Sequence, residues 1–365
     1  MADDNARSPA VGHGDALNPA VAGGNGRNPA VTGDRPCGSR TIAVTGSIAT
    51  DHLLTFPGRF VEQLLPERLD HVSLSFLADT LDVRHGGVGA NIAYGLAALG
   101  HRPVLVGAAG TDFEEYGGVL AAHGVDISAV HVSADRHTAR FMCTTDVDGN
   151  QLATFYAGAM AEADRVDLVA VIREYVVGYV LIGADDPSAM LRHTRACRAL
   201  GVPFAADPSQ QLARLDGAAV RELVDGADHL FTNEYESALL LFRTGWEHDE
   251  VLDRVGTWVT TLGAKGCRIE RADRPTLDIP AVPVPAHTDP TGVGDAFRAG
   301  YLAGVSQGWE AVDRARLGCA MASLALVTVG TQTYTVEQAR LGSALTRAYG
   351  DRAAALADLE RVGVA

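Results

Sequence analysis

Short apolar runs of strand length alternate with longer amphipathic segments along most of this chain. The first run, residues 41–45, is rich in β-branched side chains and ends at a glycine, which is typical of a buried strand. Similar runs predict strands at 104–107, 179–182, 204–206, 229–232 and 258–262. Apolar residues at helical spacing predict helices at 92–99, 111–123, 187–200 and 234–242. This alternation predicts an α/β fold in which helices cover both faces of a central, mostly parallel sheet.

Two stretches depart from this pattern. Residues 139–155 alternate apolar and polar positions as exposed antiparallel strands do, with Asp148-Gly149 as the hairpin turn. Residues 1–40 repeat Pro-Ala-Val at 9–11, 19–21 and 29–31 between glycine-rich and polar residues. Repeats this short and polar cannot bury a core, so we predict a disordered tail. The folded domain then spans 41–350, and 351–365 form a C-terminal helix or tail.

Composition argues against several classes of function. The net charge of the 365 residues is −15, which disfavours binding to nucleic acid or to an anionic membrane surface. No run reaches the roughly 18–20 apolar residues of a membrane span, and we expect no signal peptide. The five cysteines are scattered and include no CxxC pair, as expected for thiols in a reducing cytosol. We therefore expect a cytoplasmic protein.

Polar residues follow several of the predicted strands. Asp51, Asp207, Asn233 and Gly263 each come at or shortly after the end of an apolar run. Ligands of parallel sheets bind at the carboxyl ends of the strands. We expect these four positions to mark one site.

The segment 288–297 reads Thr-Asp-Pro-Thr-Gly-Val-Gly-Asp-Ala-Phe, and it carries the strongest chemical signal. Its glycines lead into Asp295 and then into apolar residues at helical spacing. A glycine-rich turn that opens a helix directs unpaired N–H groups and the positive end of the helix dipole at one point. A carboxylate there can act as the base in phosphoryl transfer to an alcohol, which predicts a small-molecule kinase. An ordinary helix start with an aspartate near its cap stays open as the alternative.

Three further motifs each allow a functional and a purely structural interpretation. At 86–91 (Gly-Gly-Val-Gly-Ala-Asn), the backbone could approach a ligand closely, or the chain could make a tight turn capped by Asn91. Asn233 and Glu236 could organise a hydrated Mg²⁺, or they could form a capping box. At 261–266 (Thr-Leu-Gly-Ala-Lys-Gly), a loop could contact a nucleotide or simply join two strands. None of these has the spacing of a dinucleotide fingerprint or a P-loop.

Taken together and in this order, the four motifs resemble those of the ribokinase-like (PfkB-type) carbohydrate and nucleoside kinases. The likeness covers roughly residues 41–350. Stretches at 41–53, 137–141, 206–214 and 231–233 are similar to the adenosine kinases of actinobacteria. The resemblance implies a ribokinase-like fold with a small β-strand lid, drawn from about 50–86 and 136–157. The chain departs from the pattern at Gly89-Ala90, where close relatives have Ala-Gly, and at Val293, where many members have Ala.

The resemblance implies transfer of a phosphoryl group from ATP to the 5′-hydroxyl of adenosine, giving AMP and ADP in purine salvage. Asp295 would be the general base, and the N–H groups of Gly292, Val293 and Gly294 would form an anion hole. The expected nucleoside contacts are Ser47, Asp51, Gly87, Asn91, Phe141, Phe155, Gln210 and Gln211. The expected contacts to ATP and to Mg²⁺ are Asn233, Glu236, Thr261, Gly263 and Gly266. Asp289 and the loop near Gly330 would surround a monovalent cation, K⁺.

Two other functions stay open. A sugar kinase of the same fold would act on ribose or another furanose, although a free sugar does not need an aromatic cover such as Phe141 and Phe155. A non-catalytic nucleotide-binding protein would keep the fold without the chemistry, but Asp295 and both of its glycines are present. We also expect exposed lid strands to pair with a second copy and form a homodimer.

Overall fold

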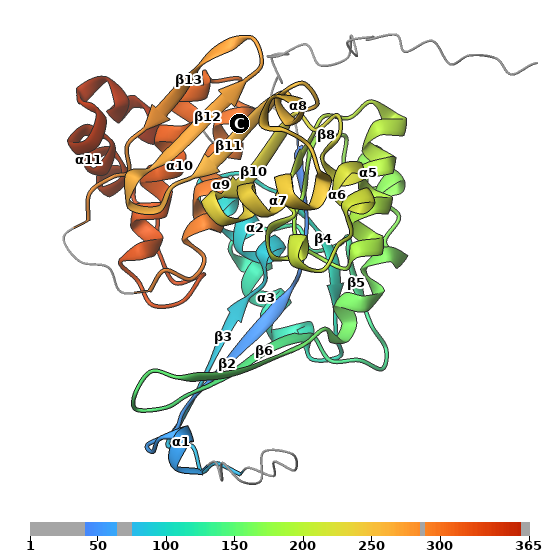
Figure 1. Ribbon diagram of the computed structural model, residues 1–365, viewed down its shortest axis with the longest axis vertical. Coiled ribbons are helices and arrows are strands. Elements are labelled where there is room, and N and C mark those ends of the chain that lie inside the picture. Colours follow the sequence, from blue (N-terminus) through green and yellow to red (C-terminus); the bar gives the residue numbers. More distant parts are fainter. Residues whose placement is uncertain (1–40, 64–74, 285–288, 359–365) are drawn as a thin grey trace, which may run out of the picture. The chain divides into compact units, whose positions relative to one another are not determined.

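The main sheet of the computed structural model has nine strands in the order β13-β12-β11-β10-β9-β8-β1-β4-β5 (Figure 1). Neighbours from β5 to β11 are parallel, whereas β12 and β13 are antiparallel and end the sheet on the β11 side. The strands are β1 (Thr41–Thr45), β4 (Val104–Ala109), β5 (Val130–Val132), β8 (Val177–Ile182), β9 (Phe204–Ala206), β10 (His229–Asn233), β11 (Thr257–Thr261), β12 (Cys267–Arg271) and β13 (Arg274–Ile279). The structure describes residues 41–63, 75–284 and 289–358, which belong to one unit, Val31–Ala365.

Buried apolar side chains project alternately from the two faces of the main sheet. Helices cover both faces because each face is apolar. Ile42 and Val44 of β1 belong to one apolar cluster, and Ala43 between them belongs to the other. The first cluster includes α2 (Val88–Ala98), α3 (Phe113–Ala122), α9 (Val293–Ser306), α10 (Ala311–Leu326) and α11 (Gln338–Tyr349). The second includes α4 (Leu168–Glu174), α5 (Pro187–Leu200), α6 (Gly217–Val224), α7 (Glu234–Thr244) and α8 (His248–Leu252). Short helices complete the described chain at α1 (Phe60–Gln63), η2 (Gly158–Arg165), η3 (Ser209–Ala213), η4 (Gly263–Lys265) and η5 (Asp351–Ala357).

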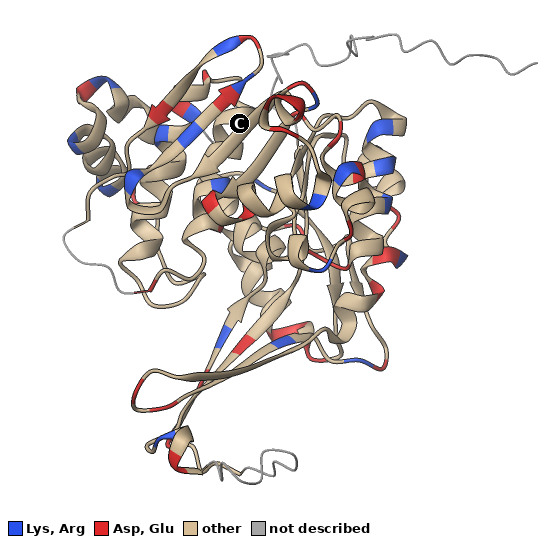
Figure 2. Cartoon of the chain, in the orientation of Figure 1, with Lys and Arg blue, Asp and Glu red and all other residues tan. Residues whose placement is uncertain are grey.

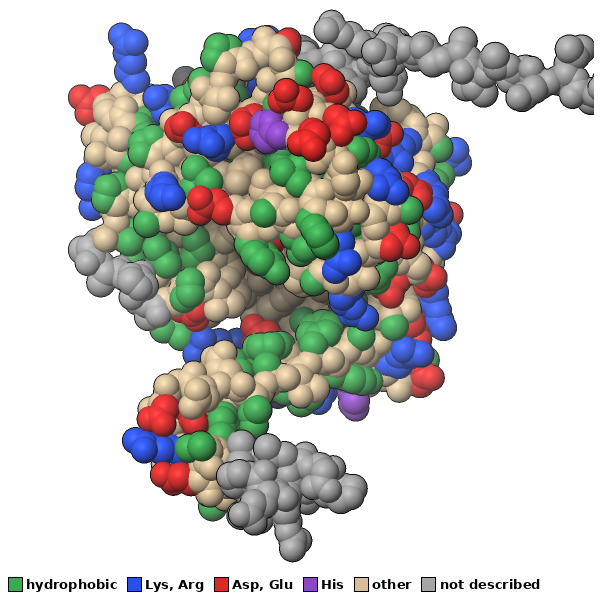
Figure 3. Space-filling model, viewed as in Figure 1, with side chains coloured by type: hydrophobic (Ala, Val, Ile, Leu, Met, Phe, Trp, Pro, Cys, Tyr) green, Lys and Arg blue, Asp and Glu red, His purple; other side chains and the backbone are tan. Residues whose placement is uncertain are grey.

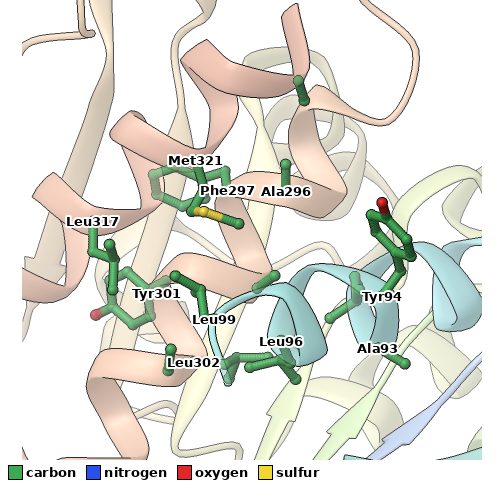
Figure 4. Packing of buried hydrophobic residues seen from close by; sticks show 14 of the residues in the cluster. Ala93, Tyr94, Leu96, Leu99, Ala296, Phe297, Tyr301, Leu302, Leu317 and Met321 are labelled. Carbon is green, nitrogen blue, oxygen red and sulfur yellow. The ribbon is translucent and has the colours of Figure 1, made fainter. Parts of the chain in front are cut away.

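Helix α9 is fixed between α2 and α10. Figure 4 shows Phe297 and Tyr301 of α9 near Leu317 of α10 and Leu99, the C-cap residue of α2, and all four side chains are buried. Each fully buried side chain of this size contributes about 1.5–3 kcal/mol to folding. The packing therefore gives the first turn of α9 a defined position.

A second, small sheet has the strand order β3-β2-β6-β7. Its strands are β2 (Ala49–Thr55), β3 (Thr80–Gly86), β6 (Ala139–Thr145) and β7 (Gln151–Tyr156). Strand β2 is antiparallel to β3 and parallel to β6, and β6 and β7 form the predicted hairpin. The chain passes from β1 into β2 and from β3 into α2 through short connections, so the small sheet extends directly from the carboxyl end of β1 (Figure 1).

The fold predicted from the sequence is confirmed, including the mostly parallel sheet, the helices on both faces and the small lid sheet. Asp51 lies on strand β2 of the small sheet, within the range from which the lid strands were expected. The antiparallel pair β12 and β13 was not predicted. The predicted tail, 1–40, lies outside the described residues.

The described cysteines and helices also bear on the expectations from composition. Cys143, Cys197, Cys267 and Cys319 are free thiols and are buried. Among the described residues, no helix has both the length and the apolar character to cross a bilayer.

Candidate active site

The N-terminal ends of α7 and α9 open on one cavity of about 540 Å³. Its walls include residues from the ends of β10 and β11 and from both helix starts. The lining residues are Ser209, Asn233, Glu234, Tyr235, Glu236, Thr261, Gly263, Gly292, Gly294, Asp295 and Arg298. The cavity thus collects seven of the predicted site residues from three separate motifs. Figure 3 shows that this side of the molecule is hollowed between the small sheet and the rest of the described chain.

The first turn of α9 has the geometry of an anion site. Gly292 is the N-cap residue with φ +75°, and a Cβ atom there would lie 2.9 Å from the side chain of Thr331. Only glycine fits this position without strain. No side chain caps the helix. The Val293 N–H makes a long hydrogen bond of 3.4 Å to the Pro290 carbonyl. The other N–H groups of the first turn have no intrahelical acceptor, and they are therefore available to an anion.

Asp295 lies in this turn and is held by a chain of hydrogen bonds. The side-chain amide of Asn91 donates to Asp295 Oδ2 at 2.8 Å. Gln332 Nε2 donates to Asn91 Oδ1 at 2.9 Å and lies 2.6 Å from the Tyr116 hydroxyl, which donates to the carbonyl of Gly86 at 2.8 Å. Because Gln332 donates to the Asn91 oxygen, the nitrogen of that amide faces the carboxylate. Asn91 thereby fixes the position of Asp295.

Burial raises the pKa of Asp295 to about 7. The Arg298 guanidinium and the Asn91 hydrogen bond lower it, and the nearby carboxylates of Asp207 and Glu236 raise it further. A carboxylate with this pKa is about half ionised at neutral pH, so it can accept a proton from an alcohol.

A buried ion pair lies directly beneath this turn. Arg298 Nε is 2.5 Å from Asp207 Oδ2, and Arg298 Nη2 donates to Asp207 Oδ1 at 2.7 Å. Both side chains are buried, at 7% and 0% exposure. Arg298 also lines the cavity, and its Nη1 would lie 2.8 Å from a Cβ atom on Gly294. Asp207 therefore fixes the positively charged guanidinium of Arg298 next to the N–H groups of the first turn of α9.

At the start of α7, Asn233 and Glu236 cap the helix and also line the cavity. Asn233 Oδ1 accepts from the Glu236 N–H, and Glu236 Oε2 accepts from the Asn233 N–H, each at 2.8 Å. This is a complete capping box. Both residues still line the cavity, with Glu236 Oε1 3.4 Å from the Ser209 hydroxyl. In the described part of the chain, no three His, Cys, Asp or Glu side chains cluster as metal ligands.

Three predicted nucleoside-binding residues form one row across the small sheet. Asp51 of β2 is directly opposite Phe141 of β6, which is opposite Phe155 of β7. Directly paired residues share a face of a sheet, so the carboxylate and both rings project from the same side. Burial raises the pKa of Asp51 to about 6, and Arg84 on β3 lowers it. Phe155 is 48% exposed, which leaves its ring available to a ligand.

Asp289 lies in a different environment from Asp295. Its Oδ1 accepts from the Thr291 N–H at 2.9 Å, and its Oδ2 accepts from the Gly330 N–H at 3.1 Å. Arg84 Nη1 also donates to Oδ2, at 3.2 Å. The Thr291 and Gly330 hydrogen bonds and the Arg84 charge lower the pKa of Asp289, although partial burial opposes them.

Comparisons with known proteins identify the family. Residues 45–339 match the model of the PfkB family of carbohydrate kinases. This chain belongs to the PfkB family. A nucleoside kinase of Methanothermobacter thermautotrophicus is 33% identical over 256 residues, which are 68% of this chain and 80% of that protein.

Solved structures of nucleoside kinases have the same fold as this PfkB-family chain. The Burkholderia thailandensis nucleoside kinase in complex with inosine is 35% identical, with a TM-score of 0.75 over 85% of this chain and 98% of that one. The Methanocaldococcus jannaschii nucleoside kinase, an archaeal member of the ribokinase family, is 26% identical, with a TM-score of 0.73 over 86% of this chain and 99% of that one. The chain is therefore a kinase that phosphorylates a nucleoside or a sugar and, as a member of this family, uses ATP with Mg²⁺.

Several predicted residues of this PfkB-family kinase lie outside the cavity lining, among them Gly266, Gln210, Gln211 and Ser47. The Gly266 Cβ position would be 2.0 Å from the Ile279 carbonyl, so this glycine permits the close approach of β13. Gln210 is exposed, whereas Gln211 is buried and donates to the Asp185 carbonyl at 2.8 Å. Ser47 Oγ accepts from the Val88 N–H at 3.0 Å and thus supports the start of α2.

The same α2 turn explains Gly87. Its φ is +96°, and a Cβ atom would lie 2.5 Å from the Ser47 carbonyl. The glycine is required for the close passage of β2 beside α2, whether or not a ligand is present.

Sequence reasoning missed four residues of the PfkB-family site: Arg298, Gln332, Tyr116 and Arg84. Arg298 lies one helical turn after Asp295 in an otherwise apolar stretch, and a lone arginine there was the signal for a buried partner. The other three carry no local motif. They reach the site only through contacts between residues more than 200 positions apart in the chain, such as Gln332 with Asn91, or through contacts across the small sheet.

Proposed function

We propose that this protein transfers the γ-phosphoryl group of ATP to the 5′-hydroxyl of adenosine, releasing AMP and ADP. The observation that carries the proposal is Asp295, a carboxylate with a pKa of about 7 beside the open N–H groups of a helix start. A base adjacent to an anion site is the arrangement that phosphoryl transfer to an alcohol requires.

In the proposed mechanism, the residues mainly orient the reactants and stabilise charge. Asp51 binds the ribose hydroxyls and directs the 5′-hydroxyl toward the γ-phosphate. Asp295 takes the hydroxyl proton as the new O–P bond forms and the bond to the β-phosphate oxygen breaks. The N–H groups of Gly292, Val293 and Gly294 stabilise the negative charge of the transferred group. The positive charge of Arg298 stabilises it further. Positioning and charge stabilisation of this kind supply most of the rate in phosphoryl transfer.

Asn233 and Glu236 fit a role near Mg²⁺ through its water shell. Their capping box fixes both side chains at the cavity wall, and a metal with several waters and phosphate ligands needs few direct protein ligands. When bound, Mg²⁺ neutralises phosphate charge. Thr261 and Gly263 line the same cavity and are proposed to contact ATP. The donors around Asp289 do not suit K⁺, and no step of the mechanism uses it.

A purine nucleoside is proposed as the acceptor because Phe141 and Phe155 lie beside Asp51. Aromatic side chains in register with a ribose-binding carboxylate can cover a flat base while the sugar is held. The similar Burkholderia thailandensis enzyme binds inosine in its crystal structure, which supports a purine nucleoside for this chain as well. Gln210 and Gln211 are proposed to contact the base.

A substrate panel tests the proposal. ADP release is measured with adenosine, inosine, guanosine and ribose, and the nucleotide product is identified by chromatography. We expect the highest kcat/KM with adenosine and AMP as the product. Preference for ribose would instead support the sugar kinase, and no turnover with any acceptor would support the non-catalytic nucleotide-binding protein.

We also propose a homodimer that forms through the small sheet. Its face opposite the Asp51 row carries Leu81, Val83, Met142 and Leu152, which are 60%, 53%, 37% and 49% exposed. Exposed apolar side chains gathered on one face favour association with a second copy. Sedimentation analysis should give the mass of a dimer for the parent and of a monomer for the variant Val83→Glu. A parent that sediments only as a monomer would exclude the dimer.

A further inference from the structure

Arg84 connects the small sheet to the loop in front of α9. Its Nη1 donates to Asp289 Oδ2 at 3.2 Å, and its Nε donates to Asp82 Oδ2 at 2.7 Å. The guanidinium thus binds one carboxylate on its own strand, Asp82, and one in the loop before α9, Asp289. The Arg84 side chain is 24% exposed and Asp289 only 16%, so bulk water screens this pair less than a surface pair. Figure 2 shows basic and acidic segments side by side where the strands of the small sheet approach the helices.

The carboxylate of Asp289 is already surrounded by donors. One oxygen accepts from the Thr291 N–H, and the other accepts from the Gly330 N–H and from Arg84. The aliphatic part of Arg84 also packs on Gly330, since its Cδ would lie 3.4 Å from a Cβ atom there. Arg84 therefore contacts both groups that the family resemblance predicts around a monovalent cation.

These contacts do not suit K⁺. An alkali cation is held by oxygen atoms that replace its hydration shell. Here N–H groups point at both carboxylate oxygens, and a positively charged guanidinium contacts one of them. A second cation beside it would be repelled.

We propose that Arg84 is the resident cation at Asp289 and replaces a bound monovalent ion in this protein. It acts as a positioning residue. Through Asp289, it holds the loop 289–292, and with it the first turn of α9, against the small sheet. It also lies directly opposite Asp51 in the β2–β3 pairing, so one guanidinium links the proposed ribose carboxylate with the loop of the anion site.

The role of Arg84 rests on the proposed function, but its test has a readout that needs no catalysis. Thermal unfolding and turnover are measured in KCl and in choline chloride at equal ionic strength. We expect the parent to show the same Tm and the same kcat in both salts, because the cation position is already filled.

Three variants sharpen the measurement. Arg84→Ala should lose about 10²-fold in kcat in choline, as expected when a catalytic group shifts by about 1 Å. K⁺ should then raise both its Tm and its kcat. Arg84→Lys keeps a point charge without the planar fork, so it should retain intermediate activity with no response to K⁺. The matched control is Arg140→Ala, which breaks a different ion pair between the small sheet and the start of α3, with Asp112, and should behave as the parent does.

Two results would overturn the proposal. The first is a K⁺-specific rise in the Tm or kcat of the parent, which would show that an ion binds beside Arg84. The second is an Arg84→Ala protein that keeps parental turnover and does not respond to K⁺. If no nucleoside or sugar is phosphorylated, the proposed function fails, whereas the Tm comparison still decides the role of Arg84. If Arg84→Ala does not fold, the parent and Arg84→Lys measurements decide it.

Discussion

Asp289 and Asp295 stand at the two ends of one short segment, and their surroundings give them opposite properties. Asp289 faces backbone N–H groups and a guanidinium, and its pKa is lowered. Asp295 has one neutral amide as its hydrogen-bond donor, and burial raises its pKa to about 7. One carboxylate is therefore fixed as an anion that holds the loop, and the other is able to exchange a proton. On our proposal, the neighbouring aspartates of one motif serve structure and chemistry separately.

The largest expected effect tests Asp295 as the base. Asp295→Asn should lower kcat by about 10²–10⁴-fold, the usual contribution of a general base, while nucleoside binding is kept. Steady-state kinetics and calorimetric titration with adenosine measure the two properties. Asp313→Asn is the matched control, because Asp313 also lies in a first helical turn but pairs with Arg316 on the surface. Near-normal turnover of Asp295→Asn would remove the assignment.

The next effect concerns the ion pair beneath Asp295. Arg298→Met leaves the fully buried Asp207 without its partner, which should lower the free energy of unfolding by about 3–5 kcal/mol. The double variant Asp207→Leu with Arg298→Met should recover most of this loss, because no charge is left buried. Urea denaturation at pH 7 compares the three proteins. Equal stability of the single and double variants would mean that the pair does not hold the α9 turn.

A smaller effect is expected at Asp289. Asp289→Asn weakens charge-assisted hydrogen bonds to Thr291, Gly330 and Arg84, which should lower the free energy of unfolding by about 1–3 kcal/mol. Because the pKa of Asp289 is lowered on folding, this contribution is present above the ordinary value of 3.8 and is lost as the pH falls below it. Denaturant titrations at several pH values measure it. The control Asp278→Asn removes an exposed pair with Arg268 and should change stability by less than about 0.5 kcal/mol.

The smallest expected effect is on the pH dependence of turnover, which should respond to changes around Asp295 but not to changes at Asp289. Turnover of the parent should rise with pH through about 7 and then level, because Asp295 acts only when it is ionised. Asn91→Ala removes a hydrogen bond that favours the ionised form, so the rise should move to higher pH. Asp289→Asn should leave the midpoint unchanged, because Asp289 is not among the groups that shift Asp295. A midpoint that moves in Asp289→Asn would contradict the independence of the two sites.

Local chemistry made much of the fold and the α9 site predictable. Strands such as 41–45 and helices such as 187–200 follow from hydrophobic period and glycine stops, and the structure has them at the same residues. The helix start at Gly292 was also predictable, because glycine, an open helix end and Asp295 are adjacent in the chain. Asn233 and Glu236 were predictable for the same reason, since three residues span one helical turn.

Long-range contacts decided the rest. Phe141 and Phe155 were predicted only through the family resemblance, and the strand register of the small sheet brought them into one row with Asp51. The same is true of Arg84 on Asp289 and of Gln332 on Asn91, which join residues far apart in the chain. Hydrophobic period fixes which face of an element is buried, but it carries no information on which distant side chain meets a given carboxylate. The sequence therefore determined the elements and the proposed base, whereas tertiary packing determined the charge environment in which that base lies.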